Sequence, residues 1–167
     1  MLMHQETLII LKPDTLERNL VGASIKYYEK AGLKILDMRF IKKVEKELLV
    51  EHYPDSMAIS IGKKAQLAVP EIKDPKAHGL KVLDKLRSYL SRGPVLAIRF
   101  GGEDAIAVAR RVTGYTDPAT AEEGTVRGDL GVDSIAKSTE EGRAVENLVH
   151  ASGNPAEAEA ELKLWMS

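Results

Sequence analysis

The sequence predicts an α+β fold in which helices cover one small antiparallel β-sheet. Short apolar runs of strand length alternate with longer segments whose apolar residues recur every three or four positions, as in amphipathic helices. Their order is strand, helix, strand, several helices, strand, helix, long loop, strand and helix. The 167 residues contain no repeat and no linker, so we expect a single domain spanning residues 1–167.

The expected elements follow one another closely along the chain. Strands are expected at residues 7–11, 34–43 and 95–100 and around His150, and helices at 20–31, 44–53, 76–91, 103–112 and 155–165. Gly32 suits the cap of the first helix, and Pro54 ends the second. The last helix has a strong start signal, because an Asn cap, a proline and a glutamate occupy Asn154, Pro155 and Glu157.

Three segments lack a clear hydrophobic periodicity. Residues 55–75 are broken by a glycine and two prolines and are rich in charge, so we expect a surface excursion with a short helix. Residues 114–129 form a long loop rich in hydroxyls and glycines, with one arginine, and donors of that kind suit a phosphate chain. Residues 133–145 are expected to form a second polar excursion.

Composition excludes several classes of protein. The formal net charge of −1 gives no general attraction to nucleic acid or to an anionic membrane, so any phosphate binding requires a local cluster of cations. The absence of cysteine excludes disulfides, thiol catalysis and thiolate metal sites. No apolar run approaches the roughly 20 residues of a membrane span, and the N-terminus lacks a signal-peptide pattern. We therefore expect a cytoplasmic protein.

One of the four histidines stands out. His150 lies in an apolar segment beside small residues, whereas His4, His52 and His78 lie in polar or helix-end contexts where inert roles are expected. A histidine in such a segment is either a satisfied core residue or a nucleophile or general base, since its ordinary pKa lies near neutrality. The residues alone leave both possibilities open.

Several motifs together resemble the nucleoside diphosphate kinase family. They are Leu11-Lys12-Pro13-Asp14, Gly114-Tyr-Thr-Asp-Pro, Gly124-Thr-Val-Arg-Gly-Asp and Asn147-Leu-Val-His-Ala-Ser. The resemblance covers most of the chain in the right order. It implies a ferredoxin-like βαββαβ core, with a strand order that the periodicity does not determine. It also implies transfer of the γ-phosphoryl group from a nucleoside triphosphate to a diphosphate through a phosphohistidine, with ping-pong kinetics and broad base specificity.

The resemblance also assigns roles to individual residues. His150 would be the nucleophile; Lys12, Arg110 and Arg127 would bind phosphates; Thr116 and Asn147 would be neutral donors; Tyr53 and Glu161 would hold the imidazole; and Ser152 and Asp129 would support the site, Asp129 by bracing the loop. Mg²⁺ would arrive with the nucleotide, because no spacing of His and carboxylates indicates a metal held by the protein.

Some of these assignments compete with simpler interpretations. Lys12 follows a strand and could be a solvated loop residue, and Glu161 could be a solvated glutamate. Glu161, however, shares a helix line with Trp165, so part of that line is expected to face inward. Arg110 and Arg111 compete for one role; they point about 100° apart on a helix, and counting back from Thr116 favours Arg110.

The chain departs from the family pattern in the region that would hold the base. It lacks the stacking phenylalanine, so what covers the base is open, and Ile59 and Ile61 are candidates. Residues 134–143 are expected to form an extra excursion, and the sequence ends at Ser167, where the family pattern leads us to expect a C-terminal extension. A homo-oligomer is still expected, with a hexamer favoured over a tetramer.

Two other functions compete with kinase activity. One is a nucleotide-binding or regulatory relative with the same fold and little turnover. The other is a ferredoxin-like nucleic-acid-binding module, against which the near-zero net charge and the 5% aromatic content argue. We therefore expect no specific nucleic acid and no membrane among its partners.

Overall fold

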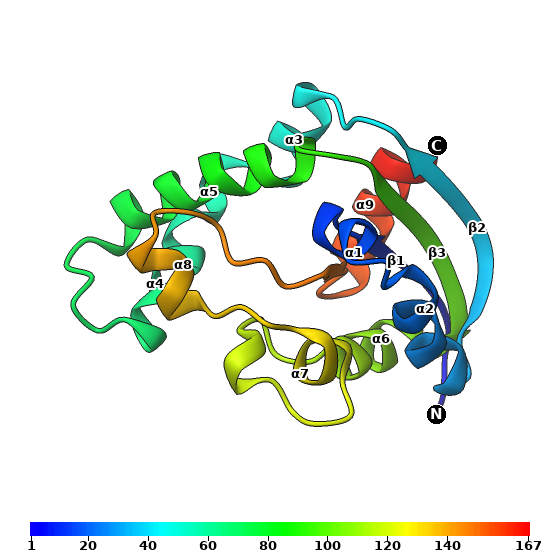
Figure 1. The fold of residues 1–167 in the computed structure, drawn as a ribbon. Helices are drawn as coiled ribbons and strands as arrows, with labels where there is room; N and C mark the ends of the chain where they lie inside the picture. Colours follow the sequence, from blue (N-terminus) through cyan, green and yellow to red (C-terminus); the bar gives the residue numbers. More distant parts are fainter.

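The computed structural model describes residues 1–167. The strands are β1 (His4–Leu11), β2 (Lys34–Ile41), β3 (Val95–Glu103) and β4 (Val149–Ala151). The helices are α1 (Pro13–Glu17), α2 (Val21–Lys30), α3 (Lys46–His52), α4 (Ala58–Ala68), α5 (Pro75–Ser91), α6 (Ala105–Thr113), α7 (Val126–Leu130), α8 (Ile135–Glu140) and α9 (Pro155–Met166), with 3₁₀ turns η1 (Asp55–Met57) and η2 (Pro118–Thr120). In Figure 1, α4, α5 and α8 gather at the end of the molecule away from the sheet.

The four strands form one sheet in the order β2-β3-β1-β4. All three neighbouring pairs are antiparallel, and β4 pairs with β1 so that His150 faces Ile10 across the ladder. This order confirms the predicted α+β class and the ferredoxin-like arrangement. It also places His150 on a short edge strand, directly beside the end of the central strand β1.

The central strand is buried on both faces, as its continuous apolar run predicted. Leu8 and Ile10 pack into a core formed with α3, α5 and α9, whereas Ile9 and Leu11 pack into a second core with α2 and α6. All four side chains are fully buried. Because the strand is clamped between two cores, the residues that follow it hold a fixed position, and the first of these is Lys12.

Residues 55–75 contain the expected helix, but this helix, α4, is 11 residues long and packs along α5 instead of forming a loose surface excursion. Gly62, which suggested a break, lies inside that helix. A Cβ at Gly62 would lie 1.7 Å from the carbonyl oxygen of Pro75, and one at Gly79 would lie 1.8 Å from that of Ala58. The two glycines therefore allow the backbones of α4 and α5 to touch, so Gly62 serves helix packing and does not mark a break.

The two other irregular segments also contain short helices that sequence periods did not show. The 114–129 loop contains η2 and α7, and the 133–145 excursion contains α8. Ser134 caps α8, since its hydroxyl accepts a hydrogen bond from the Lys137 N–H. Helix α8 contacts α4. None of the helices combines the length and apolar character needed to cross a membrane.

Candidate active site

A cavity of about 490 Å³ lies between the ends of β1 and β4 and the α4–α5 hairpin. Most of the residues singled out from the sequence line it: Lys12, Tyr53, Arg110, Thr116, Arg127, Asn147 and His150. They come from segments that are far apart in the chain. The fold therefore brings the cations, the neutral donors and the histidine to one enclosed space.

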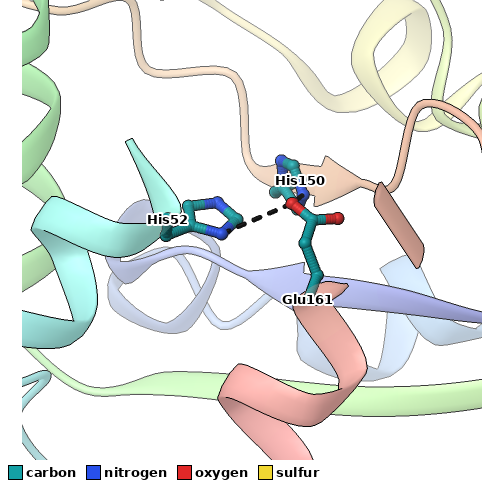
Figure 2. Close-up of side chains that lie close together, drawn as sticks. All are labelled: His52, His150 and Glu161. Carbon is teal, nitrogen blue, oxygen red and sulfur yellow. Dashed lines mark hydrogen bonds and ion pairs between the residues drawn. The ribbon is translucent and has the colours of Figure 1, made fainter. Parts of the chain in front are cut away.

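The imidazole of His150 is held by Glu161. Nε2 of His150 lies 2.7 Å from Oε2 of Glu161, which projects from α9 (Figure 2). Burial alone would raise the pKa of Glu161, but the hydrogen bond from His150 and the electrostatic interaction with the His150 and His52 imidazoles outweigh it, so the pKa is lowered. A carboxylate accepts only, so it selects the tautomer with hydrogen on Nε2. Nδ1 then keeps its lone pair and can act as a nucleophile.

His52 is part of this arrangement, contrary to the inert role expected for it. Its ring packs edge-on against His150, with 4.5 Å between centroids, and its Nδ1 lies 3.4 Å from Oε2 of Glu161 (Figure 2). The indole N–H of Trp165 donates to that Nδ1 over 3.1 Å. Burial and the His150 charge lower the pKa of His52 to about 3, so the ring is neutral.

The three side chains could also be considered as metal ligands, since one ligand atom from each lies within 4.8 Å of the others. However, Nδ1 of His52 already accepts the Trp165 N–H, and Nε2 of His150 is engaged by Glu161. The cluster therefore suits orientation of an imidazole better than metal binding. The sequence held one clue to it, because Trp165 and Glu161 share a line on α9.

Lys12 is buried at the base of the cavity. Its Nζ donates to Oδ1 of Asn147 over 2.7 Å, and the Asn147 amide in turn donates to the carbonyl of Thr116 over 3.0 Å. Burial and the nearby Arg127 lower the pKa of Lys12 to about 7, although Asp14 opposes the shift. Lys12 is thus not a solvated loop residue. No carboxylate contacts the ammonium, so an anion in the cavity would favour its charged form.

Arg127 projects from α7 into the backbone around His150. Its guanidinium donates to three carbonyls, at 3.2 Å to Asn147, 3.2 Å to Gly114 and 2.6 Å to Val149. Burial lowers the pKa of Arg127 to about 10, which still leaves it charged at neutral pH. Arg127 therefore brings a positive charge to the cavity and also ties α7 and the 114–129 loop to β4.

The backbone before His150 adopts a conformation that L-residues rarely occupy. Leu148 has φ of 72°, in the left-handed region, which costs on the order of 1–2 kcal/mol. Its N–H donates to Oδ2 of Asp14 over 3.1 Å, and its carbonyl accepts from the Thr15 hydroxyl at 2.6 Å and the Lys12 N–H at 2.8 Å. These bonds fix the turn that leads into His150. Sequence reasoning gave Asp14 no role beyond its place in the Leu11-Lys12-Pro13-Asp14 motif.

The two competing arginines have different surroundings. Arg110 lines the central cavity, whereas Arg111 lines only a shallow pocket on the far side of the 114–125 segment. Arg110 and Arg111 are both exposed. Arg110, and not Arg111, therefore shares the central cavity with His150 and Arg127.

The remaining candidates support the site from its edges. Tyr53 lines the cavity, but its ring packs edge-on against His52 and no hydrogen bond joins it to His150. The Ser152 hydroxyl is buried and accepts the Leu8 N–H at 3.4 Å. Asp129 accepts from the Gly124 N–H and the Tyr27 hydroxyl, both at 2.8 Å. Asp129 thus links the loop to α2 and does not reach the cavity.

The outer end of the cavity is formed by α4, α5 and α8. Its apolar lining includes Met57, Ile61 and Ile135, whereas Ile59 is 48% exposed and does not line the cavity. Of the two candidates for covering a base, Ile61 therefore lines the cavity and Ile59 does not. Two polar residues that sequence reasoning did not assign to the site, Lys64 and His78, also line this end.

Comparison with known proteins gives a consistent picture. The family model for nucleoside diphosphate kinase matches residues 5–62 and 75–167. A nucleoside diphosphate kinase of Pyrobaculum aerophilum is 39% identical over 96% of this chain and 94% of the relative. The crystal structure of an NDP kinase from the same organism superimposes with a TM-score of 0.89, at 37% identity, covering 99% of this chain and 97% of that one.

A second solved structure carries a ligand. It is a transition-state mimic of the nucleoside-diphosphate kinase from Borrelia burgdorferi with bound vanadate and ADP. Its TM-score is 0.83 at 31% identity, and the match covers 98% of this chain and 88% of that one.

Proposed function

The chain belongs to the nucleoside diphosphate kinase family and transfers a phosphoryl group from a nucleoside triphosphate to a nucleoside diphosphate; we propose that it does so through a phosphohistidine on His150. The observation that carries this proposal is the 2.7 Å contact between Glu161 and Nε2 of His150, at the wall of a cavity lined by cations. That contact leaves Nδ1 as the free nucleophile.

The chemistry follows from these positions. Nδ1 attacks the γ-phosphorus in line, the bond from that phosphorus to the β–γ bridging oxygen breaks, and the diphosphate leaves with the electron pair. A β-phosphate oxygen of the second diphosphate then attacks the phosphorus on His150, and Nδ1 is released. Lys12, Arg110 and Arg127 offset the charge on the phosphates. Glu161 stabilises the positive imidazole that forms.

Mg²⁺ enters as part of the nucleotide substrate in this proposal. The donor set of the cavity supports it, because Glu157 is the only carboxylate among the lining residues. Its two oxygens already accept from the Gly153 N–H at 2.8 Å and the Asn154 amide at 3.2 Å. Phosphate oxygens, and not protein carboxylates, would therefore hold the ion.

We also propose broad base specificity. The outer cavity wall offers Met57, Ile61 and Ile135, which can pack against any base through dispersion and apolar contact. The phosphate contacts described above are independent of the base. Comparing kcat/KM for the diphosphates of adenosine, guanosine, cytidine and uridine tests this, and a preference beyond about 100-fold would contradict it.

A homo-oligomer is proposed on the basis of β2. This strand is at the edge of the sheet and exposes Leu36, Met38 and Phe40, at 49%, 41% and 65%. An exposed apolar edge is a common association surface. We expect a hexamer, with a tetramer as the alternative, and sedimentation equilibrium would distinguish these from a monomer. Organisation as one domain over residues 1–167 and a cytoplasmic location also stay predictions.

One experiment tests the central proposal. The pure protein is incubated with γ-labelled ATP and Mg²⁺, and its intact mass is measured alongside that of His150→Asn. We expect an acid-labile adduct of one phosphoryl group, absent from the variant and discharged by GDP. Nucleotide binding without an adduct would contradict the proposal and favour the binding relative with little turnover.

A further inference from the structure

Lys64 is a cation that lines the cavity and has no role in the phosphoryl transfer described above. It projects from α4, one helical turn beyond Ile61, and both side chains line the cavity. Its Nζ donates to the Thr116 hydroxyl over 3.1 Å, and so joins α4 to the 114–125 segment. Lys63, its neighbour in sequence, is exposed and does not line the cavity. The helix therefore presents one lysine of this pair to the site and the other to solvent.

The surroundings of Lys64 lack a compensating negative charge. It forms no ion pair with a carboxylate, whereas other ion pairs occur throughout the chain, for example between Arg143 and Asp133 at 2.6 Å. Burial and the nearby charges of Arg110 and Arg127 lower the pKa of Lys64. A half-buried ammonium beside two other cations is unfavourable without an anion. The site is thus arranged for an anionic ligand at this position.

The place of Lys64 within the cavity indicates which anion. Lys64 is joined to Thr116 and lies near enough to Arg110 and Arg127 for their charges to act on it, and it shares the cavity with His150 and with the apolar side chains of α4 and α8. A nucleotide with its γ-phosphate at His150 and its base at the outer wall would pass Lys64 with its inner phosphates. An ammonium has three donors, and Thr116 takes only one of them.

We propose that Lys64 binds the phosphates that are not transferred, the α- and β-phosphates of the nucleotide. The proposal rests on the kinase function proposed above. Because these phosphates bind both in the ground state and in the transition state, Lys64 supplies uniform binding. Its loss should therefore raise KM and leave kcat little changed.

The test compares Lys64→Gln, which keeps a donor for Thr116 but removes the charge, with Lys63→Gln and Lys64→Arg. For Lys64→Gln we expect KM for both the triphosphate donor and the diphosphate acceptor to rise at least about tenfold, with kcat within twofold. Inhibition by inorganic pyrophosphate should weaken by a similar factor. Lys63→Gln should match the wild type, and Lys64→Arg should retain most of the affinity.

A labelling experiment on the wild-type protein complements the kinetics of the variants. Acetylation of surface lysines, read by peptide mass spectrometry, should be slowed at Lys64 by ADP or pyrophosphate and remain unchanged at Lys63. A fall in kcat at constant KM, an equal effect of Lys63→Gln, or no protection of Lys64 would overturn the proposal. Calorimetry measures ADP binding separately from phosphorylation. If ADP binding depends on Lys64 but no phosphohistidine forms, the proposed kinase mechanism is contradicted and the proposal for Lys64 is still supported.

Discussion

Oε2 of Glu161 lies 2.7 Å from Nε2 of His150, and the two residues come from the last helix and an edge strand. The bond determines which imidazole nitrogen is free, so it links the position of a helix to the choice of nucleophilic atom. His52 packs against His150, and Trp165 packs against His52 and donates a hydrogen bond to it.

Replacing the Glu161 carboxylate with an amide should slow phosphorylation of His150. Glu161→Gln removes a charge-assisted hydrogen bond, so we expect a decrease of about 10- to 100-fold in the single-turnover rate. Rapid-quench kinetics with labelled ATP would measure it. Glu159→Gln is the matched control, because Glu159 lies on the same helix, is exposed and pairs only with Lys163 at 3.5 Å. Equal rates for the two variants would contradict the role of Glu161.

The two adjacent arginines of α6 should differ in their contribution. Arg110→Ala removes a cation from the central cavity, and we expect kcat/KM to fall about 10- to 100-fold. Arg111→Ala should stay within about twofold of the wild type, since Arg111 does not line that cavity. Steady-state kinetics on both variants measures this difference. A larger decrease in kcat/KM for Arg111→Ala would contradict the assignment of Arg110 to the cavity.

Lys12 should make nucleotide binding sensitive to pH. Burial lowers the pKa of Lys12 to about 7 in the free protein, so its charge is lost as pH rises through that value. KM for the nucleotide should therefore rise above about pH 7. A Lys12→Met variant should bind more weakly and lack this rise, and a flat wild-type profile from pH 6 to 9 would argue against the lowered pKa.

The free energy of unfolding should also depend on the protonation of Lys12, but it should increase with pH. Lys12 in the unfolded chain titrates near its ordinary pKa of 10.5, so between about 7 and 10.5 the unfolded state binds more protons than the folded state. Lys12 should therefore raise the free energy of unfolding as pH increases through this window. Urea unfolding at several pH values should show this contribution in the wild type and not in Lys12→Met.

The contact between α4 and α5 should make Gly62 intolerant of any side chain. A Cβ there would lie 1.7 Å from the Pro75 carbonyl oxygen, so Gly62→Ala should lower the free energy of unfolding by about 1–3 kcal/mol. Gly22→Ala is the control in α2, where a Cβ meets nothing within 4 Å, and it should stabilise by about 0.5–1 kcal/mol. Urea titrations compare them, and equal effects would contradict the close helix contact.

Local signals in the sequence were enough for most elements of the fold. The apolar run 7–11, the cap at Gly32 and the start at Asn154 act through neighbouring residues, and the structure shows β1, the end of α2 and the start of α9 there. The motif resemblance likewise pointed to His150 and to the residues around its cavity. Each element and each single motif depends on residues close together in the chain.

The remaining features depend on contacts between distant segments. Helix α4 forms despite Gly62 because α5 packs against it, and Ile61 faces the cavity while Ile59 does not because α4 has one particular rotation. His52 reaches His150 only after α3, β4 and α9 have packed together. The amino-acid sequence by itself thus determined the local elements and the chemical groups. Only tertiary packing decided the strand order, the faces of the helices and the partners of the imidazole, because burial and close contact are set by residues that no local pattern joins.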